Sequence, residues 1–188
     1  MRPTLIAPPA LEPVSLVEAK SWLRIDTSDE DDLVSALIVA ARLSLEAMTR
    51  RLFVSQGWRL SFDGWLRRLD ATMTMELPFA PFTAVTALRI YGADGAASPV
   101  DPAIWRAPPA MDAPRIVFSQ MPPQPGRVLD SVEIEATFGY GPQASDTPEP
   151  LRRAIVATIA RLYENRGDAD VPPAAMALAA PFRRERLR

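Results

Sequence analysis

The spacing of apolar residues changes twice along the chain, and this change limits the possible folds more than any other feature. Apolar residues recur at helical spacing before Leu52 and again after Pro148. Between these points Trp58, Leu60 and Phe62 alternate with polar residues, which is typical of a half-buried strand. The sequence therefore predicts an α+β fold: a helical body of two long helices plus shorter ones, with an antiparallel β insertion between the long helices.

Capping residues and acidic side chains mark the helix starts. Ser15 and Glu18 form a capping box, in which the Ser15 hydroxyl accepts from the Glu18 amide and the Glu18 carboxylate reaches back to the Ser15 amide. Thr27 and Ser28 precede four carboxylates at 29–32, which suit the positive end of a helix dipole. The predicted helices cover residues 16–24, 29–52 and 148–166, followed by a short alanine-rich helix that ends at Pro181.

Each long helix carries a stripe of mostly apolar residues at helical spacing. The first stripe consists of Leu33, Leu37, Ala40, Ser44, Ala47 and Met48, and the second of Leu151, Ile155, Ile159 and Leu162. The predicted strands cover residues 57–63, 72–77, 84–91, 115–118 and 131–138, in one small antiparallel sheet with long loops. We expect one domain over 1–188, made of N-terminal helices (1–56), a β insertion (57–141), C-terminal helices (142–180) and a basic tail (181–188).

The composition excludes most catalytic sites. The 188 residues include no cysteine and no histidine, which removes thiolate nucleophiles, imidazole bases and the usual zinc ligands. The carboxylates at 29–32 are contiguous at a helix start, so the helix dipole explains them better than a cation site does. Glu133 and Glu135 share one strand face, where a solvated surface is favoured over paired catalytic carboxylates. We expect a protein that is not an enzyme and has no catalytic, cofactor-binding or metal-binding residues.

No segment of the sequence has the length of a membrane span. The longest apolar run, residues 33–41, is interrupted by Ser35 and is far shorter than the roughly 20 residues that a bilayer requires. The N-terminus carries one arginine and then prolines, without the apolar centre and small-residue cleavage site of a secretory signal. We therefore expect a protein of the cytoplasm with no membrane partner.

The C-terminal residues form a dense positive cluster, with four arginines in the last six positions. They follow Pro181 and show no apolar periodicity that would bury them, so we expect a free tail. A small DNA-binding protein that uses this tail on phosphates is one alternative, but a net charge of −2 is unlike the basic surface of a groove binder. A hydrolase built from Asp and Glu alone is the other, and nothing in the sequence places a nucleophile beside a base.

Six segments follow one another in an order that is hard to obtain by chance. They are PVSLVEAKSWLRI, DEDDLVSALIVAARLSLEAMTRR, ELPFAPFTAVTALRIYGADG, VEIEATFGYG, PEPLRRAIVATIARLYENRG and ALAAPFRRERLR. The ordered set resembles the head–tail connector (adaptor) proteins of long-tailed phages and of phage-like gene transfer agents. The resemblance covers nearly the whole chain. A proline-rich stretch at 99–125 and a slightly shortened segment before Pro181 depart from it.

The resemblance implies a ring, usually of twelve copies, beneath the portal of a particle. Such a ring extends the DNA channel and joins the capsid to the stopper or tail, while double-stranded DNA passes through without specific binding. The implied location is the neck of a virion or phage-like particle assembled in the bacterial cytoplasm. The C-terminal segment of such adaptors reaches the portal, which gives the tail a binding role. The implied portal-binding residues are Phe182, Arg183, Arg184, Arg186, Leu187 and Arg188.

Overall fold

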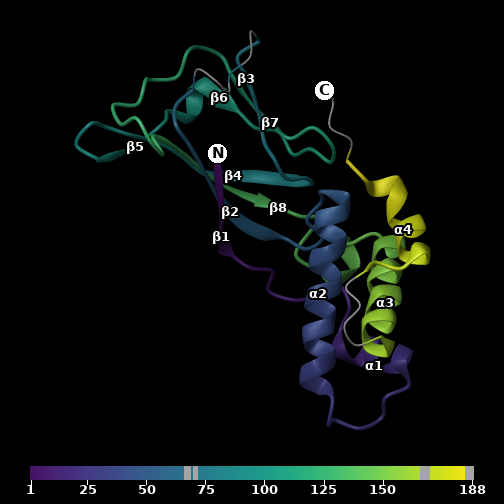
Figure 1. Ribbon diagram of the computed structural model, residues 1–188. Coiled ribbons are helices and arrows are strands. Elements are labelled where there is room, and N and C mark those ends of the chain that lie inside the picture. The colour runs from purple at the N-terminus through teal and green to yellow at the C-terminus, as the bar shows by residue number, and fades with distance from the viewer. Residues whose placement is uncertain (66–68, 70–71, 166–169, 185–188) are drawn as a thin grey trace. The chain divides into compact units, whose positions relative to one another are not determined.

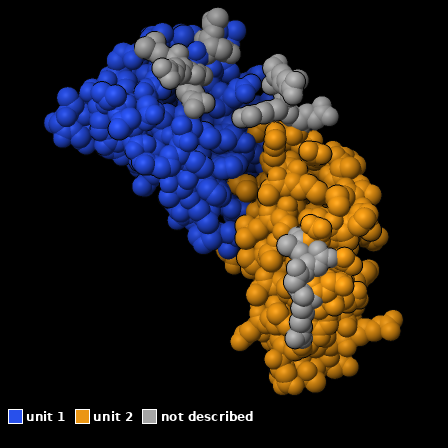
Figure 2. Space-filling model, in the orientation of Figure 1, with its two compact units in different colours: residues 1–9, 55–139 blue, residues 10–54, 140–188 orange. Residues whose placement is uncertain are grey.

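The computed structural model of the chain describes residues 1–65, 69, 72–165 and 170–184, and it divides into two compact units. Unit 1 contains residues 1–9 and 55–139, and unit 2 contains residues 10–54 and 140–188 (Figures 1 and 2). The elements are α-helices and antiparallel sheets, which confirms the predicted α+β class. The expectation that residues 1–188 act as one domain stays a prediction.

Unit 1 is built from two antiparallel sheets. The larger sheet has the strand order β1-β2-β8-β4-β5, and the smaller has the order β3-β7-β6. Their bounds are Arg2–Ala7 (β1), Gln56–Phe62 (β2), Thr74–Glu76 (β3), Phe82–Tyr91 (β4), Ala97–Pro99 (β5), Trp105–Arg106 (β6), Arg115–Phe118 (β7) and Val132–Phe138 (β8), with a 3-10 turn at Pro102–Ile104 (η1). The single predicted sheet was therefore wrong.

The five predicted strands correspond to β2, β3, β4, β7 and β8, whereas β1, β5 and β6 were not predicted. All residues of β1 and β5 are exposed, and β6 has only two residues, so none of these strands has a buried alternating face. In strands that have a buried face, the pairing register places buried residues opposite one another. Leu60 of β2 lies opposite Ile134 of β8, and both side chains are fully buried.

Unit 2 is a group of helices around one apolar core. Its helices are Leu16–Leu23 (α1), Asp31–Thr49 (α2), Glu149–Glu164 (α3) and Pro173–Ala179 (α4), with 3-10 turns at Ala144–Asp146 (η2) and Ala180–Phe182 (η3). Helix α3 packs against both α2 and α4 (Figure 1). Leu151, Ile155 and Ile159 of its predicted stripe are buried in this core. The Lys20 ammonium of α1 binds the Asp31 carboxylate at the start of α2.

The capping box before α1 is present in one direction. The Ser15 hydroxyl accepts from the Glu18 amide at 3.1 Å, as predicted. The Glu18 carboxylate was predicted to reach the Ser15 amide, but it accepts from Arg152 Nη2 of α3 at 2.8 Å. Arg152 also donates from Nε to the Pro13 carbonyl at 3.0 Å. A charge-assisted contact to a distant arginine has thus replaced a local cap, and it ties the start of α1 to α3.

The start and the buried face of α2 differ from the prediction. The N-cap is Glu30 rather than Thr27 or Ser28. The buried apolar positions are Val34, Ile38, Ala41 and Leu45, whereas Leu33, Ala40 and Ala47 of the predicted stripe are exposed. The buried face of α2 also contains the charged residues Arg42 and Glu46, which a prediction from apolar residues alone leaves out. Because apolar residues occur around most of this helix, their spacing alone did not select the face.

The residue after α2 generates a prediction about stability. Arg50 ends the helix in the left-handed conformation, with φ at 57°, which costs a side chain with Cβ about 1 kcal/mol or more. We expect Arg50→Gly to raise the free energy of unfolding by about 0.5–1 kcal/mol. The same change at Arg153, inside α3 and 71% exposed, should lower it by about 1 kcal/mol. Urea unfolding of both variants measures the two signs, and destabilisation by Arg50→Gly would contradict the prediction.

Candidate functional site

The first residues of the basic tail are held against the end of α2, so the prediction of a free tail was wrong for them. The Phe182 carbonyl accepts from Arg51 Nε at 2.5 Å, and the Arg184 amide donates to the Thr49 carbonyl at 2.9 Å. Phe182 is half-buried and packs against the apolar core of unit 2. Residues 182–184 therefore belong to the folded body of unit 2.

The end of α2 explains why this contact forms. The last carbonyls of a helix have no partner within the helix, and Thr49 carries one of them. Arg50 turns the chain away in the left-handed conformation, so the Thr49 carbonyl is available to the Arg184 amide. The backbone amide of Arg184 thus gives the last turn of α2 a hydrogen-bond partner for its Thr49 carbonyl. The sequence contains no motif that identifies this pairing, because both partners are backbone groups.

The predicted portal-binding residues fall into three groups. Phe182 contacts the core, and Arg184 is half-buried beside Thr49. Arg183 is exposed between them. Arg186, Leu187 and Arg188 lie outside the described residues. Phe182 therefore contributes to folding. The exposed Arg183 guanidinium can donate several hydrogen bonds to a carboxylate-bearing partner.

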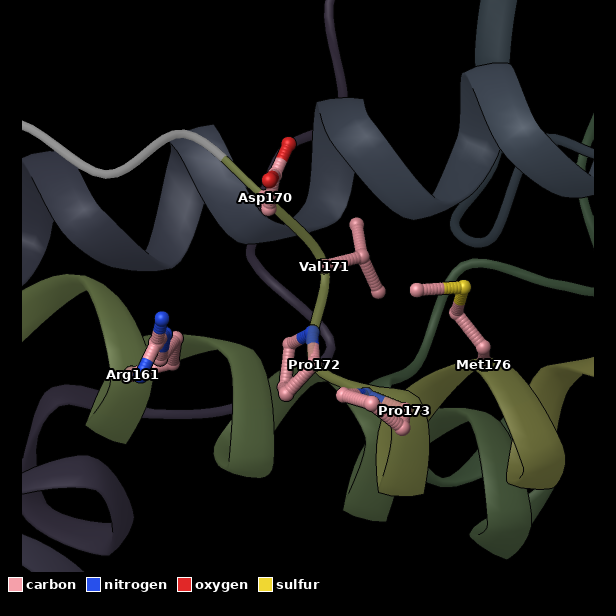
Figure 3. A pocket seen from close by; sticks show the side chains of 6 residues that line it. All are labelled: Arg161, Asp170, Val171, Pro172, Pro173 and Met176. Carbon is pink, nitrogen blue, oxygen red and sulfur yellow. The ribbon is translucent and has the colours of Figure 1, made fainter.

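Unit 2 also has a groove between α3, residues 170–172 and the first turn of α4. It has a volume of about 500 Å³ and is lined by Arg161, Asp170, Val171, Pro172, Pro173 and Met176. Figure 3 shows the Met176 side chain extending toward Val171, while Arg161 comes from α3. Four of these six side chains, Val171, Pro172, Pro173 and Met176, are apolar. The groove offers surface for contact, and its lining has no nucleophile beside a base.

The strand carboxylates Glu133 and Glu135 belong to an ion-pair cluster, so the predicted solvated face was wrong. Arg59 Nη2 lies 2.7 Å from Glu135 Oε1, and Arg89 Nη1 lies 2.8 Å from Glu133 Oε1. The Tyr91 hydroxyl donates to Glu133 Oε2 at 3.0 Å. This cluster joins the adjacent strands β2, β8 and β4 on one face of the larger sheet.

The charges in this cluster satisfy one another. Hydrogen bonding from the Arg59 side chain holds the pKa of Glu135 below its usual value. Hydrogen bonding to Glu135 raises the pKa of Arg59 in return. A catalytic acid needs the opposite shift, toward neutral pH. The cluster therefore stabilises the sheet and has no arrangement for proton transfer.

The described part of the chain has neither a cluster of metal ligands nor a membrane-spanning helix. No group of three or more acidic side chains is placed to hold a metal ion there. Of the four carboxylates at 29–32, Asp31 and Asp32 lie in the first turn of α2, as the dipole argument predicts. None of the helices within these residues is long and apolar enough to cross a bilayer.

Comparison with known proteins gives a consistent result. The family described as phage gp6-like head–tail connector protein matches residues 13–88. A chain in the neck of an empty gene transfer agent particle, computed with six-fold symmetry, is 30% identical with a TM-score of 0.86. A chain in the virion of a native gene transfer agent particle is 31% identical, with a TM-score of 0.83.

A third chain, from the neck of a native gene transfer agent particle computed with twelve-fold symmetry, is 30% identical with a TM-score of 0.72. All three matches cover 100% of this chain and 98% of the other. No match was found among curated protein sequences. The similarity therefore extends over both units and is not limited to the residues that match the family.

The ion-pair cluster generates a prediction about pH. Because the pKa of Glu135 is lowered in the folded state, its stabilising contribution is complete above the unfolded value of about 4.3 and is lost as pH falls through the folded value. We expect Glu135→Gln to destabilise the protein at pH 7, and the difference from the wild type to shrink as pH falls from about 5 to 3.

Chemical unfolding at several pH values measures this difference. Glu149→Gln is the control, because it removes an exposed ion-pair partner, 58% accessible, of a kind that contributes little. Its difference from the wild type should stay small throughout. A constant destabilisation by Glu135→Gln across the range would show that its charge does not contribute.

Proposed function

This chain belongs to the phage gp6-like head–tail connector family, and from this premise we propose that it forms a ring of twelve copies in the neck of a gene transfer agent or phage-like particle. Members of this family are structural proteins, not enzymes. The observation that carries the proposal is the match, over 100% of the chain at 30–31% identity, to chains of gene transfer agent necks and virions. Neck symmetries of six and twelve support a ring of twelve.

In the proposed ring, the helical body of unit 2 forms the wall, and the β insertion lies between α2 and α3 in sequence. The ring sits beneath the portal, extends the DNA channel and joins the capsid to the stopper or tail. DNA has to slide through such a channel, so strong phosphate binding would oppose its function. A net charge of −2 over 188 residues fits a channel that lets DNA pass without specific binding.

The C-terminal segment is the proposed contact with the portal. Its first residues are fixed to the end of α2 by Phe182 and Arg184, which gives the following arginines a defined starting point. Arginines that follow a fixed residue lose less conformational entropy when they pair with carboxylates of a partner than arginines on a long free tail do. This attachment replaces the free tail expected from the sequence.

The ring is tested by measuring the mass of the purified chain alone and after mixing with the portal of its own particle. We expect a complex that contains twelve copies of this chain for each portal ring. Mass photometry gives the stoichiometry, and negative-stain images show whether the added density is annular. Separate components at micromolar concentrations of both proteins would contradict the proposed function.

The tail is tested by two truncations that the structure distinguishes. Removal of residues 185–188 keeps the Phe182 and Arg184 contacts, so we expect unchanged thermal unfolding and weaker binding to the portal. Loss of an arginine at an interface costs on the order of 2 kcal/mol. Removal of residues 182–188 should in addition lower the melting temperature, because it exposes core surface covered by Phe182.

Co-sedimentation with the portal at low and moderate salt, together with thermal unfolding of each variant, separates the two effects. Arg153→Ala is the control for the loss of an exposed positive charge outside the tail, because its side chain lies on α3 and is 71% exposed. Undiminished binding after removal of residues 185–188 would show that these arginines do not contact the portal.

A further inference from the structure

Two neighbouring apolar side chains project from a loop of unit 1. Val128 is 79% exposed and Leu129 is 67% exposed, in the loop between β7 and β8. We call this pair the 128–129 tip. Exposed aliphatic side chains are common one at a time, whereas two adjacent ones form a small apolar patch that a partner can cover.

The loop is held on both sides of the tip. Before it, the amides of Gly126 and Arg127 donate to the Tyr91 carbonyl at 2.9 and 3.2 Å. The Arg127 guanidinium lies over the Tyr91 ring, 4.1 Å from its centre. Gly126 is required, because a Cβ at this position would lie 2.5 Å from the Ala93 amide nitrogen.

After the tip, a second set of contacts fixes Asp130. Its amide donates to Asp63 Oδ1 at 2.9 Å, and its carboxylate binds Arg2 of β1. Its carbonyl accepts from Arg127 Nη2, which closes the loop across the tip. The tip is therefore pre-organised, and little conformational entropy would be lost when a partner covers it.

Unit 2 contains a groove of complementary character. It has a volume of about 390 Å³, and its apolar lining comes from Leu11, Val14, Leu16, Ile38 and Val39. We call it the α1–α2 groove. Val14 and Ile38 are buried at its base, while Leu11 and Val39 are each 37% exposed. A dry cavity of roughly 150 Å³ holds a benzene molecule, so this groove has room for two aliphatic side chains.

Glu12, Ser15 and Ser35 add polar groups to the lining of the groove. The Glu12 carboxylate is fixed by Arg42 Nε at 2.6 Å, and the Arg42 side chain is only 6% exposed. An apolar centre with fixed polar groups around it is the usual composition of a protein interface. Leu43, one turn after Val39 and 53% exposed, continues the apolar surface along α2.

We infer that the 128–129 tip of one copy occupies the α1–α2 groove of the next copy around the ring. The inference rests on the proposed ring and names its subunit contact. A cyclic ring of more than two copies needs two different, mutually complementary surfaces on every subunit. This chain supplies a projecting apolar tip and a concave apolar groove, which are two different surfaces of complementary character.

Cross-linking tests the contact directly, because the chain has no cysteine of its own. Leu129→Cys and Val39→Cys are introduced together, and assembled portal–connector complexes are treated with a short bis-maleimide. We expect a ladder of covalent multimers of this chain on denaturing gels. Each single variant should give no ladder, and nor should Met121→Cys with Val39→Cys, since Met121 is an exposed apolar residue of the same loop, 55% accessible, outside the tip.

Mixing the two single-cysteine chains before assembly shows that the link joins different copies. A linked dimer in the mixture supports the inference. A link that forms only within one chain overturns it. Rings seen by mass photometry without any 129–39 link would also overturn it and leave the proposed function intact, whereas absence of rings in the wild type would overturn both.

Loss of the tip gives an independent measurement. Leu129→Asp places a charge in the apolar groove, so we expect the concentration needed for ring assembly to rise by about tenfold or more. Met121→Asp should change it less than twofold. Thermal unfolding of both variants should match the wild type, because both side chains are exposed. Equal assembly by the two variants would contradict the inference.

Discussion

A buried carboxylate near the end of α2 connects the parts of unit 2 from which the basic tail begins. Glu46 Oε2 accepts from Arg42 Nη1 at 2.9 Å, and its Oε1 accepts from the Phe53 amide at 2.8 Å. Burial raises the pKa of Glu46, because the charged form loses solvation. Arg42 also binds Glu12, so one short series of charges connects the N-terminal segment, α2 and the chain after it. Removal of Arg42 would take a positive charge away from both Glu12 and the buried Glu46 carboxylate, which is costly in the interior.

Residues 49–53, at the end of α2 and just after it, also bind the C-terminal half of unit 2. The Phe53 carbonyl accepts from Thr147 Oγ1 at 3.0 Å, just before α3 begins. Four residues earlier, the Thr49 carbonyl accepts from the Arg184 amide. The last turn of α2 and the residues after it therefore bind both the residue that precedes α3 and the first residues of the basic tail. The proposed contact with the portal would therefore start from a point that the core of unit 2 fixes.

The sequence predicted the elements whose faces repeat and missed those held by single contacts. The period of two located β2 and β8, and Leu151, Ile155 and Ile159 located α3. The buried face of α2 was misplaced because it includes Arg42 and Glu46, whose burial depends on partners distant in sequence. β1 was missed because all its residues are exposed. For the candidate site, the sequence indicated the arginine cluster, but the attachment at Thr49 is between backbone groups and leaves no sequence pattern.

The division of the chain into units also has a consequence for its synthesis. Unit 2 is interrupted by most of unit 1, so residues 10–54 leave the ribosome long before residues 140–188. Until then, the apolar faces of α1 and α2 lack the Leu151, Ile155 and Ile159 side chains that cover them. At about 5–20 residues per second, this interval lasts several seconds or more. During that time the nascent chain exposes the surface that aggregates or recruits a chaperone, and the helical unit becomes complete only after translation of α3 and α4.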